Sequence, residues 1–402
     1  MIGPYVLDWV SLIVRWAHFV AGVSWIGASF YFVWLDNNLT APANTRDELD
    51  GVCGELWAVH GGGFYHSQKY LTGPKGEPLS ENLHWFKWEA YTTWLSGMAM
   101  LAIVYWIGAS TYLIDKRVLD LAPGVAIAIS IGSLIVGWVV YDTLCKVLRK
   151  QPLVLGVSVF AFLVLMSWVL FHIFGARAAY IHVGAIIGTI MVANVAHVII
   201  PGQRKMLAQI RAGREPDPTP GLVGKTRSVH NTYFTLPVLF IMISNHYPVT
   251  YANPYGWIVL AALGLAGVLV RYFFILTHKR TFAWGLLVAA AIILIGTAIA
   301  IAPRQSVTVG AAPAAIISYA KVAPVIAKRC AVCHAARPTQ PGFSSAPAGV
   351  LLDTPEHTAL NAARINQAAV LTRAMPLGNV TGMTDAERSL VGAWIAGGAQ
   401  VK

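Results

Sequence analysis

The sequence predicts an all-α protein, a polytopic membrane bundle of about eight transmembrane helices followed by a small soluble cytochrome c domain. The chain is 56% hydrophobic and only 12% charged, whereas soluble domains carry about 25% charged residues. Apolar runs of about 18 or more residues, long enough to cross a bilayer as helices, recur up to residue 302. The more polar remainder contains the sequence Cys330-Ala-Val-Cys-His334.

The apolar runs define the expected spans and domain boundaries. We expect transmembrane helices at residues 7–34, 88–110, 123–146, 153–174, 180–200, 230–247, 254–277 and 282–302. The first run is long, lacks a basic start and has no clear small-residue cleavage site, so we expect it to remain as the first helix. The predicted domains are a membrane domain over 1–302, a Pro/Gly/Ala-containing linker over 303–317 and a cytochrome c domain over 318–402.

The basic residues of the loops predict the orientation of the bundle. With the N-terminus outside, most loop lysines and arginines lie inside, in the loops at 35–87, 147–152, 201–229 and 278–281. The outside loops then hold only Lys116, Arg117 and Arg177, as the positive-inside rule requires. We therefore expect a multi-pass protein of a bacterial inner membrane with both termini in the periplasm. The lipid bilayer is thus a partner, and nucleic acid is not needed to explain the net charge of +11.

The sequence from Cys330 to His334 is the C-x-x-C-H motif for covalent attachment of a c-type haem. The thiols of Cys330 and Cys333 would add to the haem vinyl groups, and His334 would bind the iron. A zinc half-site or a redox dithiol is the alternative, but the four cysteines contain no second pair. We expect Met375, which precedes a proline, as the second axial ligand, with Met383 as the alternative, because His/Met ligation is typical of cytochromes c.

The first predicted helix carries polar groups along one face. The residues of this stripe recur at intervals of three or four and are Arg15, His18, Gly22, Trp25 and Ser29. Ionisable residues within a span are costly and usually face the bundle interior or a cofactor. The stripe therefore predicts a pocket for a b-type haem, with His18 on the iron and Arg15 on a haem propionate or another anion. The alternative is a helix–helix contact with a snorkelling arginine.

Four further histidines are candidate ligands of non-covalent haem. His182 and His246 are expected near the outer face, and His197 and His230 near the inner face, so facing imidazoles would hold one or two b-type haems. His182 and His197 lie within about 60° of one helix face, but His230 and His246 are about 160° out of phase unless the helix is kinked. A hydrogen-bonded structural role is the alternative for each, and His172 is a further candidate.

The predicted inner loop contains two aromatic and basic segments. Residues 55–70 include three consecutive glycines, 61–63, and residues 84–89 read His-Trp-Phe-Lys-Trp-Glu. Glycines let a backbone approach a ligand closely. Aromatic faces beside lysine and histidine suit a flat, anionic heterocycle. An interfacial aromatic belt with snorkelling lysines is the alternative.

These segments resemble one known family, the bacterial membrane-bound urate oxidases (urate hydroxylases) with a C-terminal cytochrome c domain. The resemblance covers nearly the whole chain and includes the stretches Trp16-Ala-His-Phe, Trp57-Ala-Val-His-Gly-Gly-Gly-Phe-Tyr, His84-Trp-Phe-Lys-Trp-Glu, His230-Asn-Thr-Tyr-Phe-Thr-Leu-Pro, Ser244-Asn-His-Tyr-Pro, the C-x-x-C-H motif and Met375-Pro-Leu-Gly-Asn. It implies oxidation of urate towards 5-hydroxyisourate. Electrons would pass through the tethered haem c to a respiratory-chain acceptor, such as a soluble cytochrome c or a terminal oxidase, without peroxide release.

The inner loop then supplies a hypothetical urate site. A lysine would offset the charge of the urate monoanion and a tryptophan would stack on its ring. An imidazole would accept a proton, because histidine titrates near neutral pH. The expected catalytic residues are His60, Lys69 and Lys87, and the expected substrate-binding residues are Tyr65, Trp85 and Trp88.

Two other functional classes fit the same motifs. A subunit that oxidises quinol or another donor would keep the haem sites and use the inner loop to dock a partner. A non-catalytic membrane anchor or transporter that carries a cytochrome would contain haem c alone. Periodicity and spacing by themselves favour the donor-oxidising cytochrome, and the choice of urate depends on the resemblance.

Overall fold

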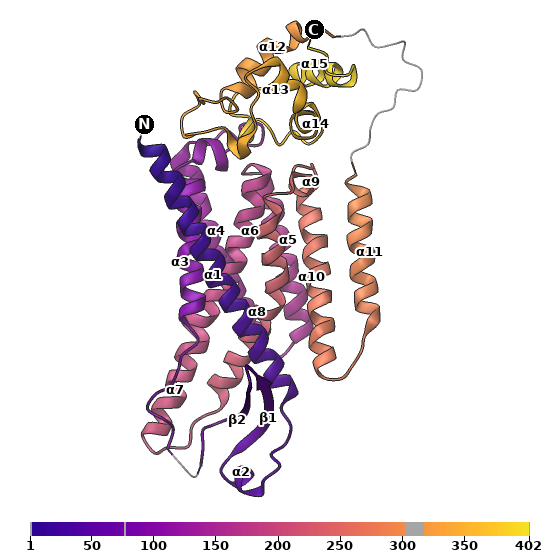
Figure 1. The fold of residues 1–402 in the computed structure, drawn as a ribbon. Coiled ribbons are helices and arrows are strands. Elements are labelled where there is room, and N and C mark those ends of the chain that lie inside the picture. Colours follow the sequence, from indigo (N-terminus) through magenta and orange to yellow (C-terminus); the bar gives the residue numbers. More distant parts are fainter. Residues whose placement is uncertain (1, 76–77, 303–316, 402) are drawn as a thin grey trace.

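Long apolar helices run side by side and form most of the protein (Figure 1). This computed structural model describes residues 2–75, 78–302 and 317–401. The bundle contains α1 (Ile2–Asn38), α3 (Trp88–Leu101), α4 (Pro123–Val147), α5 (Pro152–Phe171), α6 (Ala176–Ala193), α7 (Ile200–Arg211), α8 (Thr219–Ser244), α10 (Gly256–His278) and α11 (Trp284–Ala300), with the short α2 (Thr45–Leu49) and α9 (Pro248–Tyr251) between them. A proline lies in the first turn of α4, α5 and α8, where its missing N–H costs no hydrogen bond.

All eight ranges expected as spans are helical for most of their length, and five helical segments are long and apolar enough to cross a membrane. These five are Tyr5–Asn38, Pro123–Val147, Pro152–Phe171, Ala176–Arg211 and Gly256–His278. The second range is α3 followed by the π-helical turns η1 (Ala102–Trp106) and η2 (Ala109–Leu113), and the fifth is continued to α7 by η3 (Asn194–Ile199). Membrane insertion is therefore consistent with the structure, and the number of eight spans stays a prediction.

The prediction of an all-α chain is wrong between α1 and α3. Two strands, β1 (Val52–His60) and β2 (Gly63–Tyr70), pair there as an antiparallel hairpin. The two residues of its turn, Gly61 and Gly62, have φ angles of 60° and 83°. A two-residue hairpin turn of this type needs positive φ at both positions, which glycine adopts without strain. The glycine run therefore closes a hairpin, and this local signal was available in the sequence.

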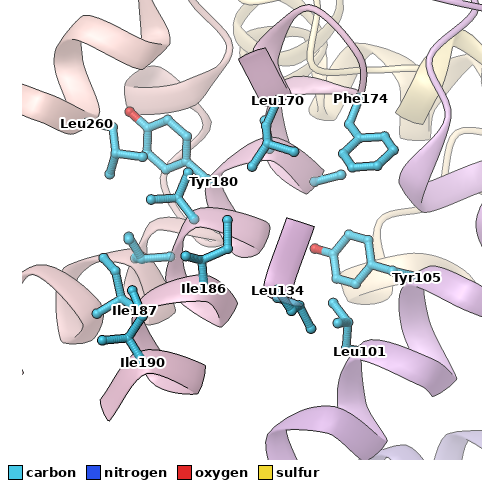
Figure 2. Close-up of a cluster of buried hydrophobic side chains, with 14 of the residues drawn as sticks. Leu101, Tyr105, Leu134, Leu170, Phe174, Tyr180, Ile186, Ile187, Ile190 and Leu260 are labelled. Atoms are coloured by element: carbon cyan, nitrogen blue, oxygen red, sulfur yellow. The ribbon is translucent and has the colours of Figure 1, made fainter. Parts of the chain in front are cut away.

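The main hydrophobic core lies between α3, α4, α5, α6, α8 and α10, where aromatic and β-branched side chains interlock (Figure 2). Gly184 of α6 lies so close to α8 that a Cβ on it would come within 2.6 Å of Cγ2 of Ile241. Lipid tails are as apolar as leucine, so helices in a bilayer associate through such close packing and through hydrogen bonds. A small residue at this contact is therefore part of what holds the bundle together.

The C-terminal domain is a small helical unit with its own core. It contains α12 (Tyr319–Ile326), α13 (Pro355–Leu360), α14 (Ala362–Ile365) and α15 (Asp385–Ala396), with the turns η4 (Ala327–Ala331), η5 (Pro347–Gly349), η6 (Asn366–Leu371) and η7 (Leu377–Asn379). Val322, Val391 and Trp394 are buried at its centre, and Thr384 and Glu387 form a capping box that begins α15. The predicted linker, apart from residue 317, lies outside the described residues.

The C-terminal domain lies at the end of the bundle that also holds the N-terminus, which we call the terminal end (Figure 1). The opposite end, with α2, β1, β2 and α7, is the hairpin end. Arg117 donates a 3.4 Å hydrogen bond to the carbonyl oxygen of Arg373, and Ser344 donates one to Asp8. Gly378, at φ 56°, lies against η2, where a Cβ would come within 2.7 Å of the Ile114 carbonyl oxygen. The segment after Met375 therefore packs directly on the bundle.

Replacing Gly378 with alanine should open this junction. The new Cβ would overlap backbone oxygens of η2, and positive φ costs alanine about 1 kcal/mol. We expect hydrogen exchange at the amides of η2 to accelerate about tenfold, with unchanged exchange in α15. Gly382→Ala is the matched control, because Gly382 also has positive φ, 66°, but its Cβ would meet only the end of the Arg329 side chain, at 3.6 Å. Equal exchange at η2 in both variants would contradict this contact.

Candidate functional site

The haem-attachment motif forms a single turn at the end of η4. The backbone N–H groups of Cys333 and His334 donate to the carbonyl oxygen of Cys330, at 3.1 and 2.9 Å. Nδ1 of His334 lies 3.0 Å from the carbonyl oxygen of Val350, which assigns the proton to Nδ1 and leaves the Nε2 lone pair for a metal. Histidine ligands of metals usually donate their second nitrogen in this way. The donor set therefore fits an axial histidine beside two thioether bonds.

The electrostatics of the two cysteines argue against a redox dithiol. Burial raises the pKa of Cys330 to about 12 and also raises the pKa of Cys333. Reactive dithiols need the opposite shift, because the thiolate is the nucleophile. Among the described residues, no group of three or more His, Cys, Asp or Glu side chains converges as a metal site, so a zinc half-site is not completed there.

The two candidate methionines lie in different surroundings. Met383 is only 3% exposed and belongs to the core of the domain. Met375 is half-buried at the edge of that core. Arg388 fixes the Met375 segment by donating to its carbonyl oxygen at 2.7 Å and to Oδ1 of Asn379 at 3.2 Å. A half-buried side chain on a fixed backbone suits an axial ligand better than one packed in the core, so Met375 remains our proposed ligand.

His182 does not fit as a haem ligand. Its side chain is fully buried, Nδ1 lies 2.7 Å from the Ala178 carbonyl oxygen, and Nε2 lies 2.7 Å from Oγ of Ser130. The ring also packs against Tyr105 and Phe174, with centroids 5.8 and 4.9 Å away. With both nitrogens hydrogen-bonded and both faces covered, this imidazole holds α6 against α4.

The histidines of the expected facing pairs lie in surroundings of different kinds. The helix expected over 230–247 begins at Thr219 and ends at Ser244, so His246 lies exposed beyond its end. His197 is exposed beside Trp138, and His172 bonds the carbonyl oxygen of Trp168 at 2.7 Å. The structure therefore gives no support to two stacked haems between α6 and α8.

His18 lies in the contact between α1 and α3, and one of its ring nitrogens remains free to bind a metal. Its Nδ1 lies 3.0 Å from the Thr93 carbonyl oxygen of α3, which leaves Nε2 without a hydrogen bond among the described residues. Gly22 is buried against the same α3 residue, since a Cβ on it would lie 3.9 Å from Cγ2 of Thr93, so the stripe of α1 is a contact surface for α3. Arg15 is exposed and donates to Oγ of Ser11 at 3.2 Å.

A buried polar network connects α4, η3 and α8 and was missed by the sequence reasoning, except for His230. Arg227 donates to Asp142 at 2.6 Å and to Oδ1 of Asn194 at 3.2 Å. Asn194 donates to the hydroxyl of Tyr141 at 3.0 Å, and this hydroxyl lies 2.8 Å from Nδ1 of His230. Arg227 was assigned to the inner loop at 201–229, because the helix was expected to start only at residue 230. Nδ1 of His230 is therefore engaged, while its Nε2 has no hydrogen bond among the described residues.

The hairpin separates the predicted inner-loop residues. His60 and Tyr65 are exposed near its turn, whereas His66 is oriented by a buried carboxylate. Nε2 of His66 lies 3.0 Å from Glu55, and the Trp57 ring stacks on the imidazole with centroids 4.2 Å apart. Hydrogen bonds from the Ala43 backbone N–H and His66 hold the pKa of Glu55 below its usual value, so Glu55 stays ionised and fixes the orientation of the His66 ring.

The predicted lysines and tryptophans lie at the base of the hairpin and the start of α3. Lys69 pairs with Asp36 of α1, which also pairs with Lys225 of α8 at 2.7 Å. The Lys87 ammonium lies 5.6 Å from the ring centroid of the exposed Trp88. Trp85 is half-buried against a small core cluster around Ala90. The predicted residues thus share the hairpin end but do not converge in one pocket.

Comparison with known proteins identifies the family of the helical bundle. The family model described as urate oxidase N-terminal matches residues 4–302. No curated protein and no solved structure matches the chain. The match begins in α1 and ends after α11, so it covers most of the sequence and the whole helical bundle. The chain therefore belongs to the urate oxidase N-terminal family.

Proposed function

We propose that this protein is an oxidoreductase that converts urate to 5-hydroxyisourate and passes the electrons out through a covalently attached haem c. The observation that carries the proposal is the presence, in one chain, of a urate oxidase N-terminal domain at 4–302 and a C-x-x-C-H motif at 330–334. Family membership supports an oxidoreductase related to urate, and the donor set of His334 supports the haem. Membrane insertion, with both termini on the periplasmic side, completes the proposal.

The reaction balances without molecular oxygen. Urate and one water give 5-hydroxyisourate, two protons and two electrons. A haem bound at Cys330, Cys333 and His334 would supply a one-electron acceptor, so the electrons leave in two steps. The final acceptor is proposed to be a soluble cytochrome c or a terminal oxidase.

The residues of the hairpin end are proposed to handle the protons. His60 stays a candidate base from the sequence. His66 ranks above it, because the ionised Glu55 orients its ring. Lys87 and Trp88 remain proposed contacts of the substrate, and Lys69 fixes β2 to α1 through Asp36.

The junction between the domains is proposed as the exit route for electrons. The segment from Met375 to Gly378 follows the proposed axial ligand and lies on η2. The cytochrome domain therefore presents the loop nearest its proposed iron site to the bundle. A short separation at this point would favour transfer between the domains.

Removing the haem attachment should stop electron export but not folding of the bundle. For Cys330→Ala/Cys333→Ala we expect no covalent haem and at least a roughly 100-fold loss of urate-dependent reduction of added oxidised cytochrome c, because one-electron acceptance is lost. Cys53→Ala, which removes an exposed cysteine outside the motif, should behave as wild type. Urate loss, cytochrome c reduction and peroxide are measured together. Full urate turnover with stoichiometric peroxide in the double variant would refute the proposed route.

The two hairpin histidines can be distinguished by substitution. We expect His66→Asn to lower kcat about 100-fold, as loss of a general base does, and His60→Asn to lower it less than tenfold. Glu55→Gln should lower kcat in the same direction as His66→Asn, since it removes the orienting charge. Steady-state turnover is compared at equal haem content. If His60→Asn is inactive and His66→Asn is active, His60 is the base and the proposed role of His66 is wrong.

A further inference from the structure

Arg271 of α10 is buried inside the bundle without a polar partner. The residue is only 4% exposed, and its guanidinium carbon lies 4.0 Å from the centroid of the Phe30 ring of α1. Within the described residues, neither Nε nor Nη2 has a hydrogen-bond partner, and both atoms are buried. This residue was not singled out in the sequence, although an arginine within an apolar span is itself a signal.

An unpaired cation at this position is costly. Buried polar groups are normally hydrogen-bonded, and a buried charge normally has an opposite charge beside it. Arg227 shows the ordinary solution in this bundle, since Asp142 and Asn194 accept from its two terminal nitrogens. For Arg271 the contact across the face of the guanidinium is instead the aromatic ring of Phe30. The unused donors indicate that a ligand supplies the acceptors.

The two free donors define the shape of that ligand. Nε and Nη2 are on one edge of the planar guanidinium, so their N–H bonds point in parallel and suit two adjacent acceptors of a flat anion. A urate monoanion offers such an edge, with a carbonyl oxygen beside a ring nitrogen. Phe30 blocks one face of the guanidinium, so the anion would approach in its plane.

We propose that Arg271 is the anion anchor of a urate-binding site between α1, α8 and α10. This inference rests on the proposed function and replaces a lysine of the inner loop as the group that holds the negative charge. Lys69 is already paired with Asp36, which it shares with Lys225. Lys87 lies beside the exposed Trp88, where water screens the charge. Arg271 is the stronger anion binder because it is desolvated and has a two-donor edge.

A second buried donor of α10 lies between Arg271 and the hairpin end. His278 is seven residues after Arg271, two turns along the same face of α10, and its Nδ1 is also buried without a partner among the described residues. At the same end, Asp36 connects Lys69 of β2 and Lys225 of α8 to α1. A flat anion entering here would meet His278 first and Arg271 about 10 Å deeper along α10.

The test is urate binding to the full-length protein in detergent. The protein is reduced with dithionite and kept anaerobic, so that urate binds without turnover, and affinity is measured by titration calorimetry. We expect Arg271→Met to weaken binding at least about 100-fold and Arg271→Lys about tenfold, because lysine keeps the charge but loses the paired donors. Lys279→Gln, which removes an exposed cation from the same end of α10, should stay within about twofold of wild type.

Two further readouts separate ligand binding from a structural role. Arg271→Met should melt at the same temperature as wild type or higher, because it removes an unpaired buried charge. Its content of non-covalent haem should equal that of wild type by pyridine haemochrome. Loss of such haem would assign the arginine to a propionate and overturn the inference.

The remaining outcomes distinguish this inference from the proposed function. If wild type and Arg271→Met bind urate equally, the anchor is elsewhere and urate oxidation still stands. If wild type binds no urate at all, both the anchor and the proposed function fail.

Discussion

Polar groups buried between apolar helices must find partners inside the protein, and this requirement organises the bundle. Ser130 bonds His182 and joins α4 to α6. Arg227 joins α8 to α4 and η3 through Asp142 and Asn194. In a bilayer no water can satisfy such groups, so each unmet donor costs free energy. Arg271 is the one arginine side chain among the buried groups that lack a hydrogen-bond partner in the described residues. It is therefore the most informative residue of the bundle, because a ligand would supply the acceptors that those residues do not.

The proposed function assigns proton transfer to the hairpin end of the molecule and electron export to the terminal end. The hairpin end holds the Glu55–His66 pair and the terminal end holds the C-terminal domain, which is proposed to carry the haem. Arg271 is 15 residues (271 − 256) from the start of α10, about 22 Å at 1.5 Å per residue. Under the proposed function, electrons from urate bound at Arg271 would have to cover this distance to reach the C-terminal domain. His18, whose Nε2 is free in the α1–α3 contact, and His230 in the buried network are the residues whose donor chemistry fits an intermediate haem.

The fold could be predicted from the sequence where one residue pattern decides the structure. Apolar length located the helices, and the C-x-x-C-H motif located the turn that presents Cys330, Cys333 and His334. The hairpin was missed because three glycines were interpreted as space for a ligand, although paired aromatic runs around a Gly-Gly turn also indicate two strands. Apolar periodicity likewise misplaced the start of α8, since its first turns carry Lys225 and Arg227.

The candidate site was harder to predict because its partners come from different helices. Nothing local to Arg227 shows that it will meet Asp142, and nothing local to Arg271 shows that its Nε and Nη2 will meet no acceptor in the described part of the chain. Likewise, His182 and His18 look equivalent in sequence, yet one has both nitrogens occupied and the other only one. Such differences depend on helix rotation and register, which periodicity constrains only coarsely.

The most direct test of the account is the visible spectrum of the oxidised, full-length protein during anaerobic addition of urate. The account predicts that the reduced c-type band appears without oxygen, with two electrons delivered for each urate consumed. An absent c-type band after urate, followed by full reduction with dithionite, would contradict the account. The haem would then be present and intact, but urate would not be its electron donor.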